Sequence, residues 1–209
     1  MNESARIRIL SVDDHALVRE GIATVINDQP DMQVVADAAT GDEAIARFRQ
    51  HLPDVTLLDL RLPDKSGIEV LTAIRREFPE ARIIMLTTFE GDVEVQRALE
   101  AGARGYLFKS TAPESMFQVI RKVHAGKTHV PAEIAVHLAE HVADEQLTRR
   151  ELDVLEQLAG GNRNRDIAAK LSVAEGTVKI HVKNILQKLR AIDRTHAVTI
   201  AVRRGIIRL

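Results

Sequence analysis

A chain of 209 residues that is 45% hydrophobic and 28% charged has the composition of an ordinary globular protein, and allows one large domain or two small ones. It contains no cysteine, which excludes disulfides, thiolate metal sites and cysteine nucleophiles. No apolar run is long enough to span a bilayer, and the N-terminus lacks the basic-then-apolar order of a signal peptide, so we expect a cytoplasmic protein without a membrane partner.

The net charge of −1 conceals two parts of opposite sign. Residues 1–125 carry 15 Lys and Arg against 20 Asp and Glu, a balance of −5, whereas residues 144–209 carry 13 against 8, a balance of +5. This split favours two domains with different partners, with nucleic acid as the candidate partner of the basic one. Random drift in surface charge would explain the same numbers, so charge alone does not decide.

Strand and helix patterns alternate through the first part of the chain. Short β-branched runs predict strands at 6–12, 32–38, 54–59, 82–87 and 104–109. Apolar residues at helical spacing predict helices around 17–26, 44–48, 68–74, 93–99 and 113–123. This alternation favours an α/β fold, a doubly wound parallel sheet of five strands covered by helices on both faces. Ligands of such sheets bind beyond the carboxyl ends of the strands.

The pattern changes after residue 125. Residues 132–142 form an isolated helical segment, and 144–204 predict four helices without a strand, interrupted at 160–161, 172–176 and 191–194. We therefore expect a first domain at 1–125, a linker with a helix at 126–143, and a small all-α domain at 144–209.

Polar residues follow the predicted strands where their carboxyl ends should meet. They are Asp13, Asp14, Asp59, Thr87 and Lys109. Neighbouring carboxylates repel unless cations compensate them, and Lys109 together with an oxygen-bound Mg²⁺ would do so. A carboxylate beside Mg²⁺, a lysine and a hydroxyl can accept a phosphoryl group as a nucleophile. Each residue taken alone is more often a solvated turn residue, and the prediction depends on the set.

The segments SVDDH, LLDLRLPDKSGIEVL, MLTT and AGARGYLFK resemble the receiver domain of bacterial two-component response regulators, over residues 6–123. The resemblance implies a flavodoxin-like sheet of order 2-1-3-4-5, in which Asp59 accepts phosphoryl from a sensor histidine kinase. It further implies that Mg²⁺ is bound by three carboxylates and one backbone carbonyl, those of Asp13, Asp14, Asp59 and Arg61. Lys109 would pair with the phosphoryl group and Thr87 would reorient toward it. Tyr106 would be the coupled aromatic switch, with simple packing as its alternative.

The basic part has a helix-turn-helix pattern. Thr148 and Glu151 form a capping-box sequence, and 163–171 and 174–189 predict two amphipathic helices joined by a short turn. The second helix carries lysines beside its apolar stripe and could enter a DNA major groove, although a solvated helix face would look similar.

This segment resembles the LuxR-type helix-turn-helix of the NarL/FixJ subfamily, over residues 145–207. The resemblance implies base contacts by Lys179, Ile180 and Lys183. It implies phosphate contacts by Thr177, Lys188 and Arg163, and a dimerisation helix at 193–203. The chain departs from the family pattern at Asn162 and Arg163, which affects the second helix cap, and at Ala191, where a glycine helix stop is usual.

Together these features predict a response regulator transcription factor that acts as a homodimer on double-stranded DNA when phosphorylated or DNA-bound, with RNA polymerase as a further candidate partner. It would not be an enzyme beyond its own phosphorylation and dephosphorylation. The charge split suggests that the acidic domain masks the basic one at rest. One alternative is a phosphorylation-independent pseudo-receiver. A remote alternative is a zinc hydrolase, since His137 to His141 match H-x-x-E-H.

Overall fold

The computed structural model describes residues 6–88, 92–132, 134–136 and 147–207 of the chain. Residues 1–89 and 96–135 form one compact body, here called the N-terminal unit, and residues 136–209 belong to a second, the C-terminal unit. The predicted domain boundaries at 125 and 144 stay predictions. Within the described residues, no helix has the length and apolar character required to cross a membrane.

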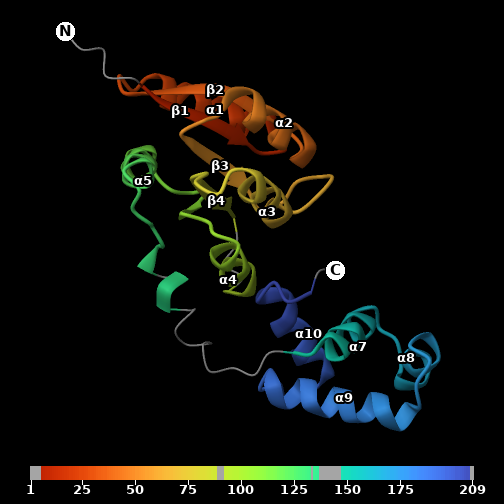
Figure 1. Cartoon of the computed structure of the whole chain (residues 1–209). Helices are drawn as coiled ribbons and strands as arrows, with labels where there is room; N and C mark the ends of the chain where they lie inside the picture. Colours follow the sequence, from red (N-terminus) through yellow and green to blue (C-terminus); the bar gives the residue numbers. More distant parts are fainter. Residues whose placement is uncertain (1–5, 89–91, 133, 137–146, 208–209) are drawn as a thin grey trace. The chain divides into compact units, whose positions relative to one another are not determined.

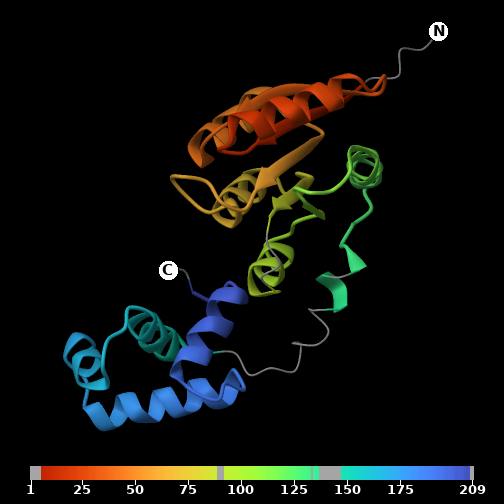
Figure 2. The same cartoon turned by 180° about the vertical axis from the view of Figure 1, so that it is seen from behind.

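The N-terminal unit alternates strands and helices along the chain, as the sequence predicts. Its strands are β1 (Ile7–Val12), β2 (Met32–Ala38), β3 (Val55–Asp59), β4 (Ile83–Thr87) and β5 (Gly105–Phe108). Its helices are α1 (Ala16–Asn27), α2 (Gly41–His51), α3 (Gly67–Glu77) and α5 (Pro113–His124), and α4 (Asp92–Glu100) belongs to it from residue 96 onward. All neighbouring strands pair in parallel, in the order β2-β1-β3-β4-β5. Figures 1 and 2 show the sheet and its helices from opposite sides. The predicted fold class and strand order are confirmed.

Both faces of this sheet are buried, which explains why the strands are apolar runs and not alternating patterns. On one face, residues of α1 and α5 pack against alternate strand residues; this cluster includes Ile9, Leu57, Leu86, Ile26 and Ile120. The other strand residues, such as Leu10, Leu58 and Met85, are also fully buried. Apart from Ser11 and Thr56, the buried polar residues of the strands lie at or just after their carboxyl ends, at Asp13, Asp59 and Thr87.

The loop after β3 is held by contacts of the residues that lead into α3. Ser66 and Glu69 form a capping box at the start of α3, and the Asp64 carboxylate accepts the backbone N–H groups of Gly41 (2.7 Å) and Asp42 (3.0 Å) at the start of α2. At Gly67 a Cβ atom would lie 2.1 Å from the Asp59 carbonyl oxygen, so only glycine fits there. These contacts hold the residues that follow β3 close to the sheet edge.

The chain after α5 returns to the open edge of β5. The His129 N–H donates to the Arg104 carbonyl, and the Tyr106 N–H donates to the His129 carbonyl, both at 3.0 Å. Burial, with a smaller effect of Lys122, lowers the pKa of His129. Residues 132 and 134–136 are helical, and Ile134 is buried. The remainder of the predicted linker helix lies outside the described residues.

The C-terminal unit is helical throughout its described part, as predicted. It contains α7 (Arg149–Ala159), α8 (Asn164–Lys170), α9 (Glu175–Lys188) and α10 (Arg194–Arg203). Val154, Ile167, Val178, Ile185 and Ala197 are among the residues of its buried core. The capping box of Thr148 and Glu151 is confirmed, and α8 and α9 form the predicted helix-turn-helix.

The end of α9 corrects one expectation. We expected Ala191 to occupy the position of a glycine helix stop, but the residue with a left-handed backbone is Arg190, with φ of 51°. The Ala191 N–H donates to Leu186 O (2.8 Å) and the Arg190 N–H to Gln187 O (3.1 Å), which is a Schellman motif. The helix therefore ends in the usual way, with an arginine where glycine would be less strained.

Candidate functional site

The ends of parallel strands bring the predicted acidic residues together at one edge of the sheet. Asp13 follows β1, Asp59 is the last residue of β3, and Lys109 follows β5. The Lys109 Nζ atom lies 2.5 Å from Asp13 Oδ2 and 2.7 Å from Asp59 Oδ2. Asp13 is fully buried, and Asp59 is 4% exposed. Residues far apart in sequence thus form a buried carboxylate–ammonium–carboxylate cluster.

Burial and pairing act in opposite directions in this cluster. Burial is the largest influence on Asp59 and raises its pKa above the ordinary value, although hydrogen bonds from Lys109 and from the Arg61 N–H oppose it. Burial alone would lower the pKa of Lys109, but its hydrogen bonds to Asp13 and Asp59 outweigh burial and raise it. Lys109 therefore stays charged, while Asp59 is a carboxylate whose negative charge is incompletely compensated.

The cluster also meets the requirements of a divalent cation site. Ligand atoms of Asp13, Asp14, Asp59 and His15 all lie within 4.8 Å of one another. Three carboxylates form an oxygen donor set that suits Mg²⁺. The Arg61 N–H donates to Asp59 Oδ1 at 3.2 Å, so Arg61 is adjacent to the site, and the role of its carbonyl as a ligand stays a prediction.

His15 is a residue that the sequence interpretation missed. Its backbone N–H donates to Asp13 Oδ1 at 2.9 Å. Its ring Nδ1 lies 2.6 Å from Asp14 Oδ1 and 3.2 Å from Asp13 Oδ1. The signal was present, because His15 directly follows the two aspartates, but adjacency in sequence does not fix where a ring points.

Two predicted switch residues lie close by. Thr87 ends β4 and is 4% exposed, and its carbonyl accepts the Lys109 N–H at 2.7 Å. Tyr106 lies within β5 and is fully buried. The phosphoryl-dependent movements expected for both residues stay predictions.

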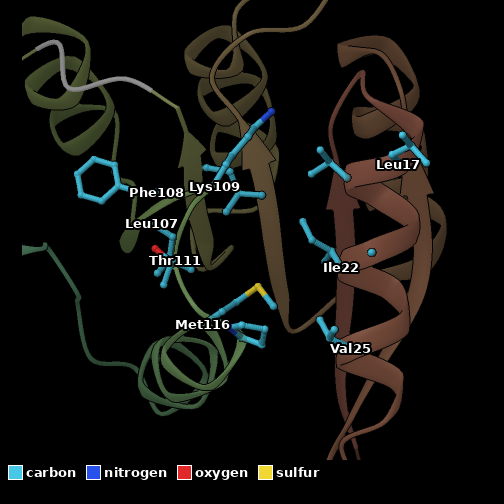
Figure 3. Close-up of a pocket in the computed structure, with 12 residues that line it drawn as sticks. Leu17, Ile22, Val25, Leu107, Phe108, Lys109, Thr111 and Met116 are labelled. Carbon is cyan, nitrogen blue, oxygen red and sulfur yellow. The ribbon is translucent and has the colours of Figure 1, made fainter.

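An apolar hollow of about 320 Å³ adjoins Lys109. Figure 3 shows Ile22 and Val25 of α1 facing Met116 of α5 across it. Leu17 of α1, which lines it, is 83% exposed. Because Lys109 belongs both to this hollow and to the acidic cluster, the two are direct neighbours. Sequence periodicity placed these apolar residues on core-facing stripes and gave no sign that a space remained between them.

The second helix of the helix-turn-helix, α9, presents three of the predicted DNA-contacting residues to solvent. Ile180 is 61% exposed, the Lys179 side chain is 64% exposed, and Lys183 is exposed. Lys179 forms a surface ion pair with Glu175 at 3.0 Å, and Thr177 is half-buried. An exposed isoleucine between lysines suits contact with a thymine methyl group and phosphates.

Lys188 was expected on the exposed side of α9, but its side chain is largely buried against α7. Its Nζ atom is 2.9 Å from Glu151 Oε2, and its side chain is only 16% exposed. Burial alone would raise the pKa of Glu151, but the bonds from Lys188 and Thr148 outweigh it and lower that pKa. The pair ties α9 to the start of α7, so Lys188 has a structural partner, and its phosphate contact stays a prediction.

The departures at Asn162 and Arg163 are accommodated locally. Asn162 accepts hydrogen bonds from Lys170 on its side chain (3.0 Å) and from Arg194 on its carbonyl (2.6 Å). Arg163 precedes α8, and its N–H donates to Asp166 at 3.3 Å. Its phosphate contact stays a prediction. The HLAEH motif lies outside the described residues.

Comparison with known proteins agrees with this architecture. A model of the response regulator receiver domain matches residues 9–121, and a model of the luxR family of bacterial regulatory proteins matches residues 145–201. The chain is 45% identical to the transcriptional regulatory protein YxjL of Bacillus subtilis, covering 97% of this chain and 98% of YxjL. It is 38% identical to the response regulator VraR of Staphylococcus aureus, covering 96% of this chain and 99% of VraR.

Solved structures give the same result. The crystal structure of the response regulator ChrA, from a haem-sensing two-component system, is 31% identical with a TM-score of 0.58, covering 97% of this chain and 100% of ChrA. The RcsB–DNA complex, at 23% identity and a TM-score of 0.71, covers 95% of this chain and 98% of RcsB and supports the fold alone. The chain is therefore a member of the response regulator family, with a receiver domain followed by a LuxR-type helix-turn-helix domain.

Proposed function

We propose that this chain is a transcription regulator whose Asp59 accepts a phosphoryl group from a sensor histidine kinase. The buried pairing of Lys109 with Asp13 and Asp59 supports this proposal most strongly. It presents a nucleophile whose charge is incompletely compensated, next to a cation fixed in place. Such an arrangement favours reaction with a phosphoryl group, since both the nucleophile and the charge stabiliser are already positioned.

In the proposed transfer, a carboxylate oxygen of Asp59 attacks phosphorus as the N–P bond of a kinase phosphohistidine breaks, leaving the electron pair on the imidazole. The product is an acyl phosphate. Lys109 then exchanges part of its present pairing for the phosphoryl oxygens, and the hydroxyl of Thr87 donates to one of them. Mg²⁺ would neutralise further negative charge. It would be held by the carboxylates of Asp13, Asp14 and Asp59 and by the backbone carbonyl of Arg61.

The proposed output is binding of the C-terminal unit to double-stranded DNA as a homodimer. A phosphoryl group adds about two negative charges and three acceptor oxygens. Movement of Thr87 and Tyr106 toward a second arrangement would carry this change through the N-terminal unit. On DNA, Lys179, Ile180 and Lys183 would reach base edges, and Thr177 would contact phosphate. RNA polymerase stays a candidate partner.

Incubation of the full chain with acetyl phosphate and Mg²⁺ tests the phosphoacceptor assignment. Mass spectrometry should show the gain of one phosphoryl group on wild type and on the matched control Asp54→Asn, which changes an aspartate just before β3. Asp59→Asn should show no gain. Gain surviving Asp59→Asn would refute Asp59 as acceptor, and no gain on wild type would leave a phosphorylation-independent regulator.

Genomic DNA fragments selected by the wild-type chain test the interface. Lys183→Ala should weaken binding and relax the sequence preference at the base that it contacts, and Ile180→Ala should alter sequence preference with little change in the salt dependence of binding. Lys127→Ala, an exposed lysine of the N-terminal unit, is the control. If both α9 variants bound DNA as tightly and as selectively as this control, α9 would not be the helix that contacts the DNA bases.

The opposite charges of the two parts also support masking of the basic domain at rest. Isolated residues 144–209 should then bind the selected DNA more tightly than the unphosphorylated full chain. Equal or weaker binding by the fragment would exclude masking.

A further inference from the structure

His15 turns its ring toward the acidic residues that precede it. It occupies the position just before α1, but among the described residues its side chain makes no hydrogen bond that caps that helix. The ring Nδ1 instead contacts the Oδ1 atoms of Asp14 and Asp13, at 2.6 Å and 3.2 Å. The backbone N–H of the same residue also donates to Asp13 Oδ1. Main chain and ring therefore direct the nitrogen to the candidate cation site.

The spacing of these atoms is that of neighbouring metal ligands. In an octahedral site with bonds of about 2.1 Å, adjacent ligands are separated by about 3.0 Å. The two distances from Nδ1 lie on either side of that value. Lys109 approaches the other oxygen, Oδ2, of both Asp13 and Asp59. Lysine and histidine thus contact different oxygen atoms of the Asp13 carboxylate, so Lys109 does not occupy the Oδ1 side that Nδ1 faces.

We infer that His15 is a nitrogen ligand of the divalent cation at this site and that it shifts the site's preference from Mg²⁺ toward Mn²⁺. The inference rests on the cation site of the proposed function and adds a donor to it. Mg²⁺ prefers oxygen donors and keeps several waters, so it gains little from an imidazole. Mn²⁺ and the later divalent metals bind imidazole more readily, in the Irving–Williams order.

The exposure of the ring makes the inference testable. The His15 side chain is 69% exposed, so its removal opens no buried cavity and should leave the fold intact. A histidine that only donated a hydrogen bond to the aspartates would affect all divalent cations alike. A ligand would change Mn²⁺ binding selectively and would leave a spectroscopic signature.

The experiment uses the full chain with His137→Ala and His141→Ala in every sample, so that the HLAEH pair supplies no nitrogen ligand. Mn²⁺ alone is the probe, and electron spin echo modulation reports nitrogen bound to it. The parent protein and a His124→Ala control, at the end of α5, should show nitrogen modulation, and His15→Ala should not. The dissociation constant for Mn²⁺ should rise about tenfold in His15→Ala, while that for Mg²⁺, measured by competition, should change by less than about twofold.

The outcomes separate this inference from the proposed function. Mn²⁺ binding that Asp13→Asn abolishes, but that shows no nitrogen modulation, would remove His15 as a ligand and leave the cation site standing. Modulation that persists in His15→Ala, or equal weakening of both cations, would also overturn the inference. Absence of any Mn²⁺ binding by the parent would remove both the inference and the cation site on which it depends.

Discussion

Replacement of Lys188 by Met should destabilise the C-terminal unit by about 3 kcal/mol, since removing one partner of a buried ion pair costs about 3 to 5 kcal/mol. The lower end applies for two structural reasons. Glu151 Oε2 would keep its bonds from the Thr148 N–H (2.8 Å) and hydroxyl (3.0 Å). The Lys188 side chain is also 16% exposed, so the pair is incompletely desolvated. A change of this size increases the population of the opened unit about 150-fold.

The partner substitution separates charge from packing. Glu151→Gln keeps an oxygen that can accept from Thr148 but removes the buried charge. The double variant Glu151→Gln with Lys188→Met should therefore be less destabilised than Lys188→Met alone, by about 1 to 2 kcal/mol. This order of stabilities follows only if the cost of losing Lys188 comes from an uncompensated Glu151 carboxylate.

Hydrogen exchange of the full chain, read by mass spectrometry on peptides from α7 and α9, measures these changes, with α1 as an internal reference. If the change in the free energy of opening in the double variant equalled the sum of the changes in the two single variants, the two residues would not be coupled. The same proteins test the phosphate contact. If Lys188 also binds DNA, the double variant should show a salt slope smaller by about 0.9 than Glu151→Gln alone, and an equal slope would assign Lys188 a purely structural role.

Three further predictions concern other positions. Gly67→Ala should destabilise the N-terminal unit by about 3 kcal/mol or more and abolish phosphoryl gain, because the new methyl group would meet the Asp59 carbonyl. Gly21→Ala is the control, since a methyl group there would have no described atom within 4 Å, and it should stabilise α1 by up to about 1 kcal/mol. Calorimetry of the two variants measures both changes. The pKa of Asp59 is higher in the folded than in the unfolded protein, whose value is the ordinary 3.8. Protonated Asp59 therefore contributes to folding stability below pH 3.8, and this contribution is lost as the pH rises. Asp59→Asn should therefore raise the unfolding midpoint at pH 7 by a few degrees, and this gain should vanish below about pH 3.8. Arg190→Gly should stabilise the C-terminal unit by about 1 kcal/mol, since glycine adopts the left-handed backbone of that position without strain; slower hydrogen exchange at the end of α9 would confirm it.

Much of the N-terminal unit could be predicted because one physical rule operates along its whole length. Strands buried on both faces are mostly apolar, so a polar residue at the end of an apolar run indicates where the strand leaves the core. Asp59, Thr87 and Lys109 were located in this way, and the parallel sheet brought their strand ends to one edge. The strand bounds agree with the expected runs to within a residue at either end.

The missed features depend on directions and distances that a linear pattern does not contain. Lys188 lies beside exposed positions on a helical wheel, but the tertiary approach of α7 draws it to Glu151. The left-handed residue fell at Arg190 because the hydrogen bonds of the helix end, and not residue type, determine where the chain reverses. The hollow beside Lys109 arises from the separation of α1 and α5, which periodicity cannot measure.

Strand β5 joins the acidic cluster to the segment that follows α5. Lys109, at its carboxyl end, bonds to the acidic cluster through its side chain and to Thr87 through its backbone. Earlier in the strand, the Tyr106 N–H binds His129, in the segment that leads away from α5 toward the C-terminal unit. Since β5 is an edge strand, this segment covers backbone groups that would otherwise be open. A shift of Lys109 toward a phosphoryl group would therefore act on the same four-residue strand that holds the departing chain.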